Sequence, residues 1–204
     1  MEKPAPVQSP IHELLARRWS PRAFDARPIE ADKLRILFEA VRWAPSSNNE
    51  QPWRFIVAGK EQRTAYDRLL ACLVEGNRTW ASRAPLLVLS VARLNFEESG
   101  KPNRHALHDT GMATENLLLQ ATALELAAHP MAGFDAEKAR ADLKIPSGYD
   151  PVAMIAVGYP GDPSILPDRL RQREQALRER NGVSAFVFAG EWGKPLPLAP
   201  AQDE

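Results

Sequence analysis

The sequence predicts an α/β or α+β sandwich of two or three layers, in which helices pack on a central sheet. Two observations lead to this fold class. Three short apolar segments, at 53–59, 84–92 and 151–160, have the composition of buried strands. Helical patterns and polar loops separate them along the chain. The length of 204 residues fits a single domain, 1–204, with one core.

Helices are predicted on both sides of the first strand. Ser9 can cap a helix that ends at the two arginines of "IHELLARR". Over 30–43 apolar side chains recur at helical spacing, and the "AP" that follows stops the helix. After the strand 53–59, a second amphipathic helix places Tyr66 on its apolar face and stops near Gly76.

The second half of the chain continues this alternation. The polar segment 95–105 is expected to be a mobile loop. An Ala- and Leu-rich helix is predicted over 107–128 as the core helix, followed by a short amphipathic helix at 136–143. A charged, solvated helix covers 166–180. The apolar, extended tail at 184–197 is expected to dock on a partner subunit.

Composition excludes several classes of function. Lysine plus arginine and aspartate plus glutamate each total 26, so no net charge recruits nucleic acid or an anionic membrane, and any anion site must be local. The only cysteine, Cys72, cannot form an intrachain disulfide, which favours the cytoplasm. We expect neither a secretory signal nor a membrane span, since no run approaches about 20 apolar residues.

Arginines gather in two places. "RRWSPRAF", 17–24, offers guanidinium groups and a serine hydroxyl on a proline-stiffened turn after a helix, which suits a phosphate or another oxyanion. "RER", 178–180, would supply a second clamp on the same kind of anion. Each is equally readable in isolation as a solvated helix end or charge run.

Three further segments carry polar or backbone groups suited to a ligand. "APSSNNEQPW", 44–53, compresses many donors and acceptors between a helix and a strand. Asn77 and Trp80 lie one helical turn apart, where an amide could read a heterocycle and an indole could pack beside it. Gly133 in "PMAGF" allows a backbone N–H to approach a planar ligand. Each segment also has a purely structural alternative. These are a connecting loop for 44–53, a capped helix with a core tryptophan for Asn77 and Trp80, and a helix-ending turn for Gly133.

Other catalytic patterns are weakly represented. His105 and His108 are three residues apart, but no cysteine or carboxylate cluster with ligand spacing accompanies them, so no metal site is predicted. The chain has neither a GxGxxG motif nor a P-loop, no recognisable Ser-His-Asp set, and Cys72 lies on an apolar helix face. A nucleophilic enzyme, and hence a dedicated catalytic side chain, is not predicted.

Taken in order, "RRWSPRAF", "APSSNNEQPW", "NRTW" before "APLLVLSV", "HPMAGFD" and the late "RER" resemble the FMN-dependent nitroreductase family over nearly the whole chain. The resemblance implies an α+β, nitroreductase-like fold with a central mixed or antiparallel sheet flanked by helices. It also implies an intertwined homodimer with two FMN sites at the interface, and a C-terminal segment, 184–204, that reaches the partner subunit.

The resemblance assigns cofactor contacts to named residues. Arg18 and Ser20 would hold the FMN phosphate or ribityl chain, with Arg17 in support. Arg178 and Arg180 would complete the phosphate clamp. Arg22 would face the pyrimidine edge of the flavin near N1 and O2, and Asn77 would hydrogen-bond the same ring system. From the other subunit would come Pro45, Ser46, Ser47, Asn49 and Gln51. Ala132 and Gly133, beside Met131, would present backbone amides toward N5 and O4.

The implied activity is that of an NAD(P)H-dependent FMN oxidoreductase. Hydride from NADH or NADPH would reach flavin N5 and then leave to a nitroaromatic, a quinone or a similar electron-poor acceptor. Two anionic parts of one ligand, its phosphate and the reduced ring, would meet separate arginines, which explains the cationic start of the chain. The sequence does not choose between the two nicotinamides.

This chain departs from the family pattern at three positions. Trp19 stands where many relatives have a smaller or more polar residue, so its backbone would serve the cofactor. Trp80 stands where some members carry a lysine, which leaves the ribityl contacts there open. Ala132 replaces an acidic residue of one branch, which leaves substrate preference open.

Two other functions are compatible with the same fold. One is an FMN enzyme that acts on an activated alkene or uses flavin itself as its substrate. The other is a flavin-binding protein without redox turnover.

Overall fold

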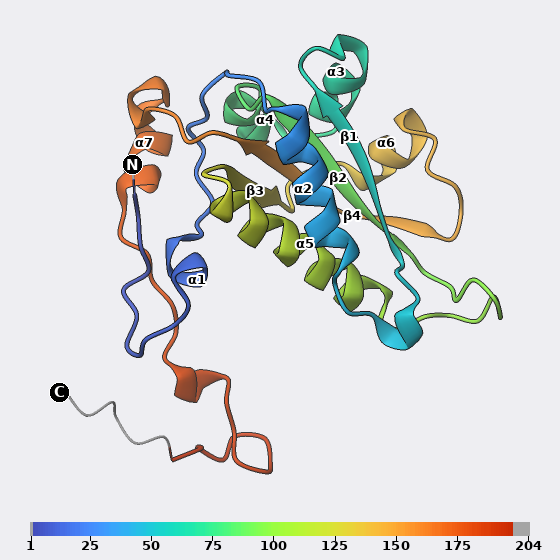
Figure 1. The fold of residues 1–204 in the computed structure, drawn as a ribbon, viewed down its shortest axis with the longest axis vertical. Coiled ribbons are helices and arrows are strands. Elements are labelled where there is room, and N and C mark those ends of the chain that lie inside the picture. The colour runs from blue at the N-terminus through green and yellow to red at the C-terminus, as the bar shows by residue number, and fades with distance from the viewer. Residues whose placement is uncertain (1, 198–204) are drawn as a thin grey trace.

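A four-stranded antiparallel sheet forms the centre of the computed structural model, which describes residues 2–197. The strands follow the order β1-β2-β4-β3, so β2 and β4 are central and β3 is an edge strand (Figure 1). Their bounds are Trp53–Gly59 for β1, Leu86–Arg93 for β2, Ala127–Met131 for β3 and Tyr149–Gly158 for β4. The predicted α+β class with an antiparallel sheet is confirmed.

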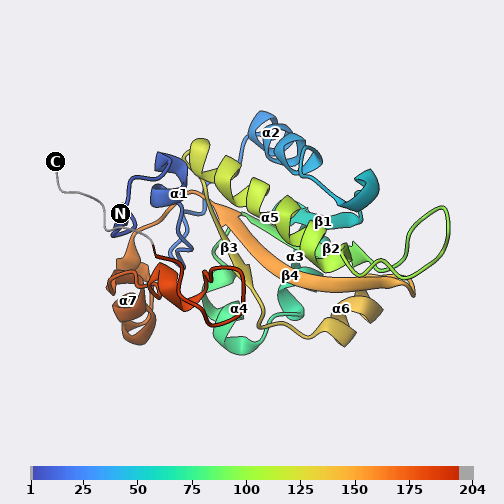
Figure 2. The same ribbon diagram turned by 90° about the horizontal axis from the view of Figure 1, so that it is seen from below.

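Helices cover both faces of the sheet, which gives three layers (Figure 2). One face carries α2 (Ala31–Arg42) and α5 (Ala106–Ala123), and the other carries α3 (Arg63–Ala71), α4 (Glu75–Ala81) and α6 (Ala136–Asp142). Successive side chains of a strand point to opposite faces. All eight residues of β2 are therefore buried, because each one meets a helix layer on its own side.

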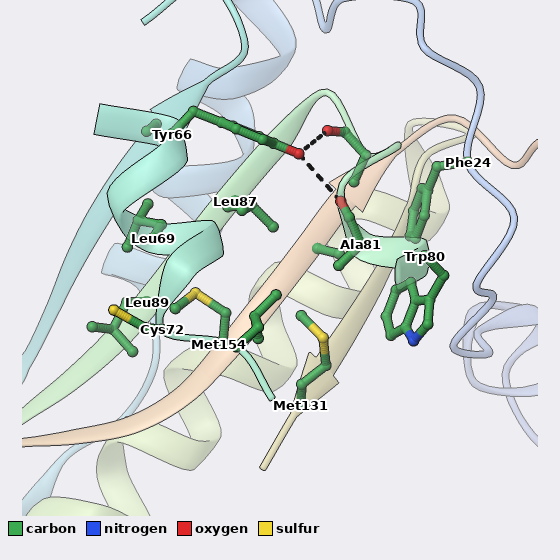
Figure 3. Packing of buried hydrophobic residues seen from close by; sticks show 14 of the residues in the cluster. Phe24, Tyr66, Leu69, Cys72, Trp80, Ala81, Leu87, Leu89, Met131 and Met154 are labelled. Atoms are coloured by element: carbon green, nitrogen blue, oxygen red, sulfur yellow. Dashed lines mark hydrogen bonds between the residues drawn. The ribbon is translucent and has the colours of Figure 1, made fainter. Parts of the chain in front are cut away.

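Buried hydrophobic residues pack between the sheet and the helices α3 and α4 (Figure 3). Leu87 and Leu89 of β2 and Met154 of β4 point into it. Tyr66 is buried there with its hydroxyl donating to the carbonyl oxygens of Ala81 and Ala84, at 3.2 and 2.7 Å. Burial raises the pKa of the Tyr66 phenol above its usual value, so it remains a hydrogen-bond donor.

The predicted helix over 107–128 ends five residues early, and the sequence interpretation missed a strand. Glu125 adopts a left-handed φ of 59°, and the N–H of Leu126 donates to the carbonyl of Ala121, which closes α5. The chain then turns back, and Ala127–Met131 pairs with β4 as β3. Alanine favours helices, but burial on the sheet and ladder hydrogen bonds override that preference here.

Three other helix predictions need correction. The first helix, α1 (Glu13–Arg17), begins after His12, whose ring Nδ1 accepts from the Leu14 N–H, so Ser9 is not its cap. The helix predicted to stop near Gly76 is two helices, α3 and α4, because the chain breaks at Cys72–Val74 to pair with residues 133–134. The charged helix is α7 (Asp168–Gln175), shorter than predicted.

The remaining segments are short turns and extended chain. The 3-10 helices η1 (Ser47–Asn49), η2 (Pro163–Ile165) and η3 (Val183–Ala185) punctuate loops. After α7 the chain runs away from the sheet, and the side chain of Trp192 is 92% exposed there (Figure 1). The prediction that the segment 184–204 reaches a partner stays a prediction, and residues 198–204 lie outside the described part. Among residues 2–197, no helix combines the length and apolar character that a membrane crossing requires.

Candidate functional site

A cationic cavity lies where the two ends of the described chain meet. The N-terminal segment runs beside the chain that follows α7 (Figure 1). Between them is a cavity of about 180 Å³, lined by Lys3, Arg18, Trp19, Ser20, Arg22, Arg173, Arg178 and Arg180. Six of these eight side chains are cationic, and no carboxylate lines the cavity. We call this the arginine pocket.

Arg178 ties the arginine pocket together. Its Nη1 donates to the carbonyl oxygens of Lys3 and Ala16, at 2.9 and 2.7 Å, and so fastens the C-terminal segment to the N-terminal one. Burial, with the positive charges of Arg18 and Arg180, lowers the pKa of Arg178. Those neighbours repel one another, so an anion in the pocket would relieve a standing excess of positive charge.

His129, a residue of the sheet, holds the turn that carries Arg18, Ser20 and Arg22. The imidazole lies on β3, and its Nδ1 is 2.8 Å from the carbonyl oxygen of Pro21, so the tautomer protonated at Nδ1 donates to that oxygen. Burial above all, and then the charges of Arg22 and Arg18, lowers the pKa of His129 to about 4. The ring is therefore neutral near pH 7.

At the far end of β3, Asn77 and Gly133 form a second part of the site. The Asn77 Nδ2 donates to the Gly133 carbonyl at 3.0 Å. A side chain at Gly133 would place its Cβ 2.6 Å from that nitrogen and 3.0 Å from Cγ2 of Val74. Only glycine leaves this pairing intact. Ala132 is exposed beside it, whereas Met131 is buried in the core (Figure 3).

The predicted partner-facing loop lies elsewhere. Buried Asp109, in the first turn of α5, accepts the Ser47 N–H at 3.0 Å and pins η1 there. The Ser46 hydroxyl accepts the Gln51 N–H at 3.0 Å. Asn48, Asn49 and Gln51 all adopt left-handed φ values, between 48 and 55°. Such backbone is costly for residues other than glycine, and it is typical of loops held for a function.

This loop and the arginine pocket lie at different positions along α5. Arg17 lies near its C-terminal end, where Glu125 binds it, and Arg18 lies 3.9 Å from Glu115 in the middle of the helix, whereas Ser47 is bound at its first turn. The helix has 18 residues and thus spans about 27 Å. Figure 1 shows η1 at one end of α5 and α1 with α7 at the other. One chain therefore carries two separate groups of predicted site residues.

The family model of nitroreductases matches residues 15–159, well over half of the chain. This chain belongs to the nitroreductase family. The chain is 34% identical over 149 residues to an uncharacterised 15.4 kDa protein of Mycolicibacterium smegmatis, covering 70% of this chain and 99% of that one. It is 28% identical to a Stenotrophomonas maltophilia protein that bears the name NADH dehydrogenase/NAD(P)H nitroreductase, over 78% of this chain and 89% of that one.

Solved structures give the same result. The crystal structure of an FMN-containing oxidoreductase superposes with a TM-score of 0.88 at 35% identity, over 93% of this chain and 96% of that chain. A nitroreductase family protein of Clostridium difficile superposes with a TM-score of 0.68 at 25% identity, over 87% and 96% of the two chains. By its family, the protein is an oxidoreductase.

Two predicted cofactor contacts are not placed as the resemblance implied. Arg17 turns away from the arginine pocket, because its guanidinium binds Glu125 at 2.7 Å and faces Glu13. The Trp80 side chain is only 2% exposed, stacked between Phe24 and His129 in the core (Figure 3). Its ring is therefore a core residue beneath the turn that carries Arg18, Ser20 and Arg22, which was the structural alternative for Trp80. It is not open to a ligand.

Sequence reasoning also missed three residues of the site. Lys3 and Arg173 line the arginine pocket, and Glu174 lies directly behind it. Lys3 belongs to a segment without a regular pattern, and Arg173 and Glu174 belong to a helix in which charged residues alternate. No signal in the sequence marks Glu174 as the one buried carboxylate of that helix, because its burial depends on the distant turn.

Proposed function

We propose that this nitroreductase is an FMN-dependent NAD(P)H oxidoreductase that reduces nitroaromatics, quinones or similar electron-poor acceptors. The observation that carries the proposal is the arginine pocket. Residues from both ends of the sequence bring six cations around about 180 Å³ without an opposing carboxylate in the lining. The FMN named for a structural relative, and the NAD(P)H named for a sequence relative, support the choice of cofactors.

The donor set of the pocket fits a phosphate dianion. Guanidinium groups bind phosphate oxygens through paired N–H donors and stay charged at all physiological pH values. Arg18, Ser20, Arg178 and Arg180 would hold the phosphate and the adjoining ribityl chain, and Lys3 adds a cation from the N-terminal segment. A neutral or cationic ligand would leave the mutual repulsion of these groups unrelieved.

The rest of the chain offers groups for a flavin ring. Arg22 would face its pyrimidine edge and stabilise negative charge there, which favours the reduced cofactor. The Asn77 amide and the exposed backbone at Ala132 and Gly133 supply hydrogen-bonding groups at the other end of β3. FMN, when bound, supplies hydride acceptance from NADH or NADPH and hydride donation to the acceptor at its N5. We propose no side-chain base, and protons would come from water.

We further propose that the active unit is a homodimer. The first turn of α5 holds the loop that carries Pro45, Ser46, Ser47, Asn49 and Gln51, and none of these residues lines the arginine pocket of its own chain. A two-fold related partner would bring its loop to the pocket of the first chain, and each chain would complete the other's site. The exposed aromatic residues of the tail, among them Phe186 and Trp192, would then be covered by the partner.

We also propose that the chain is a single domain, 1–204, and that the protein is cytoplasmic. The location is inferred from the sole cysteine, because Cys72 is free and buried, which suits a reducing compartment.

The test starts from the purified protein. Its visible spectrum, with and without added FMN, is expected to show bound oxidised flavin. Anaerobic addition of NADH or NADPH should bleach that spectrum, and a nitroaromatic or quinone should restore it. Protein that takes up no FMN at micromolar concentration would overturn the proposal. Reduction without reoxidation by any nitro compound or quinone would overturn the acceptor class alone.

A further inference from the structure

Glu174 is the buried carboxylate that joins the two ends of the chain. Its side chain is 1% exposed, although it lies on the most charged helix of the described residues, α7. Its Oε1 accepts two backbone N–H groups of the segment 17–24, which we call the arginine turn. These hydrogen bonds come from Arg22 at 2.7 Å and from Ala23 at 3.0 Å. Its backbone carbonyl accepts the Lys3 ammonium at 2.7 Å. One residue of α7 thus contacts two other segments that line the arginine pocket, the turn at Arg22 and the N-terminal segment at Lys3.

The second carboxylate oxygen is placed differently. Oε2 of Glu174 is buried and has no hydrogen-bond partner among the described residues. It lies 3.6 Å from Nη1 of Arg22, which is an ion-pair contact without a hydrogen bond. A buried carboxylate oxygen normally holds a donor, so this atom acts on Arg22 mainly through its charge.

The surroundings of Glu174 explain why a fixed negative charge is useful there. Six cations line the pocket, and without an anion they repel one another. A carboxylate behind the lining offsets part of this positive charge without occupying the cavity. Its two hydrogen bonds to backbone N–H groups hold the turn against α7 before any ligand arrives, and this arrangement is preorganisation for an anion.

We propose that Glu174 is a positioning residue for the cofactor: it fixes the backbone of the arginine turn and, through its charge, limits how much positive charge Arg22 presents to a flavin. This inference rests on the proposed FMN site. The two roles separate by substitution, because glutamine keeps an oxygen for the two backbone N–H groups and loses the charge, whereas alanine loses both.

Opposite effects are therefore expected from E174Q and E174A. With E174Q, Arg22 loses its intramolecular partner, so FMN affinity of the cofactor-free protein should rise by about five-fold and the midpoint potential of bound flavin should become more positive. With E174A, the turn loses its anchor, so FMN affinity should fall by about ten-fold or more. Amide hydrogen exchange over 20–24 should accelerate in E174A and change little in E174Q.

Glu179→Gln is the matched control. Glu179 is exposed on the same segment, and its removal changes net charge near the pocket without touching a buried contact. E179Q is expected to behave like the unaltered protein in affinity, potential and exchange. If E174Q matches E179Q, or lowers affinity as E174A does, the charge role of Glu174 is refuted. If exchange over 20–24 is unchanged in E174A, the anchoring role is refuted.

The exchange measurement needs no cofactor, so it separates this inference from the proposed function. Unaltered protein that fails to take up FMN would overturn the proposed function and the electrostatic half of the inference. The anchoring half would still stand or fall on the exchange over 20–24.

Discussion

At the residue scale, the arginine pocket shows how charge and hydrogen bonding divide their tasks. Arg178 uses its Nη1 to bind two backbone carbonyls, whereas the Arg180 side chain makes only a local bond, to the Glu179 carbonyl. Arg17 belongs to neither group, because Glu125 holds it outside. Three neighbouring arginines in space thus have three different roles, and each role is testable.

Replacing Arg178 and Arg180 together by alanine should weaken FMN binding by roughly 100-fold, because two charge-assisted contacts to phosphate are lost. The loss should shrink as salt is raised, since screening already weakens these contacts in the unaltered protein. Titration of cofactor-free protein with FMN at several ionic strengths measures both effects. Arg17→Ala is the control, and we expect it to leave affinity unchanged. Equal losses in the two variants would contradict the location of the clamp.

His129 gives stability a pH dependence of defined sign. Its pKa is lowered to about 4 in the folded protein, against an ordinary value of 6.5. Above pH 6.5 neither state binds the proton and the folded state keeps its full stability. As pH falls toward 4, the unfolded state takes up a proton that the folded state refuses, so stability is lost.

The loss from this one group should approach ~3 kcal/mol below pH 4. Urea unfolding between pH 4 and 7 of the unaltered protein and of His129→Gln measures it. The variant starts less stable, because its ring no longer packs on Trp80. It should nevertheless lose less stability on acidification, since the other titrating groups are common to both proteins. Parallel pH curves would show that His129 is not the group responsible.

At the element scale, α5 acts as a spacer with a functional contact at each end. Asp109 in its first turn holds the Ser47 amide, and the chain just beyond its last turn holds Arg17 through Glu125. One face of the helix is buried from Ala106 to Ala121, so the separation between the two contacts is set by its rigid geometry.

Asp109→Ala should release the loop that begins at Pro45. The Ser47 N–H loses its acceptor, which should cost about 1–3 kcal/mol of stability. Hydrogen exchange over 45–51 should become faster, while exchange in β2 follows the global stability only. His108→Ala is the matched control, because His108 is 69% exposed and faces the same carboxylate at 3.3 Å without holding the loop. Unchanged exchange over 45–51 in Asp109→Ala would mean that other contacts suffice to hold it.

At the scale of the whole molecule, a shared site makes a prediction that a single-chain site does not. One variant carries Arg178→Ala with Arg180→Ala, and the other carries Ser46→Ala with Asn49→Ala. Each homodimer then has two defective sites. A mixed dimer has one site with both defects and one site with none, because pocket and loop come from different chains.

Unfolding and refolding the two variants together at equal amounts should therefore restore FMN binding to about a quarter of all sites, since half of the dimers are mixed and each has one intact site. Flavin retained after gel filtration measures this fraction. The same variants refolded separately and then combined cold serve as the control. No recovery above that control would mean that the loop serves the pocket of its own chain.

Much of the architecture follows from local chemistry. The strand at 53–59 and the helix within 30–43 carry their own periodicity and stop signals, and both formed where the pattern predicted. The order of the short motifs was sufficient to indicate the family, which the match over 15–159 confirms. Helix ends were less predictable, because a capping residue such as His12 competes with equally plausible neighbours such as Ser9.

The candidate site was only partly accessible to sequence reasoning. Arg18, Ser20, Arg22, Arg178 and Arg180 were predicted to converge, and they line one cavity. Trp80 and Arg17 were chosen by the same motifs but face the core and Glu125. A motif fixes which side chains are near one another along the chain, but it does not give the direction in which each side chain points.

What the amino-acid sequence by itself determined is the set of local elements, the two arginine-rich ends and the family to which they belong. Only the tertiary structure decided that 127–131 is an edge strand, that Glu174 is buried behind the pocket, and that the loop at 45–51 is held at the first turn of α5 and does not line that pocket. The physical reason is the range of the interactions. Periodicity and capping act over a few residues, whereas strand pairing, burial of a carboxylate and the distance between two contacts depend on chain segments as far as 171 residues apart.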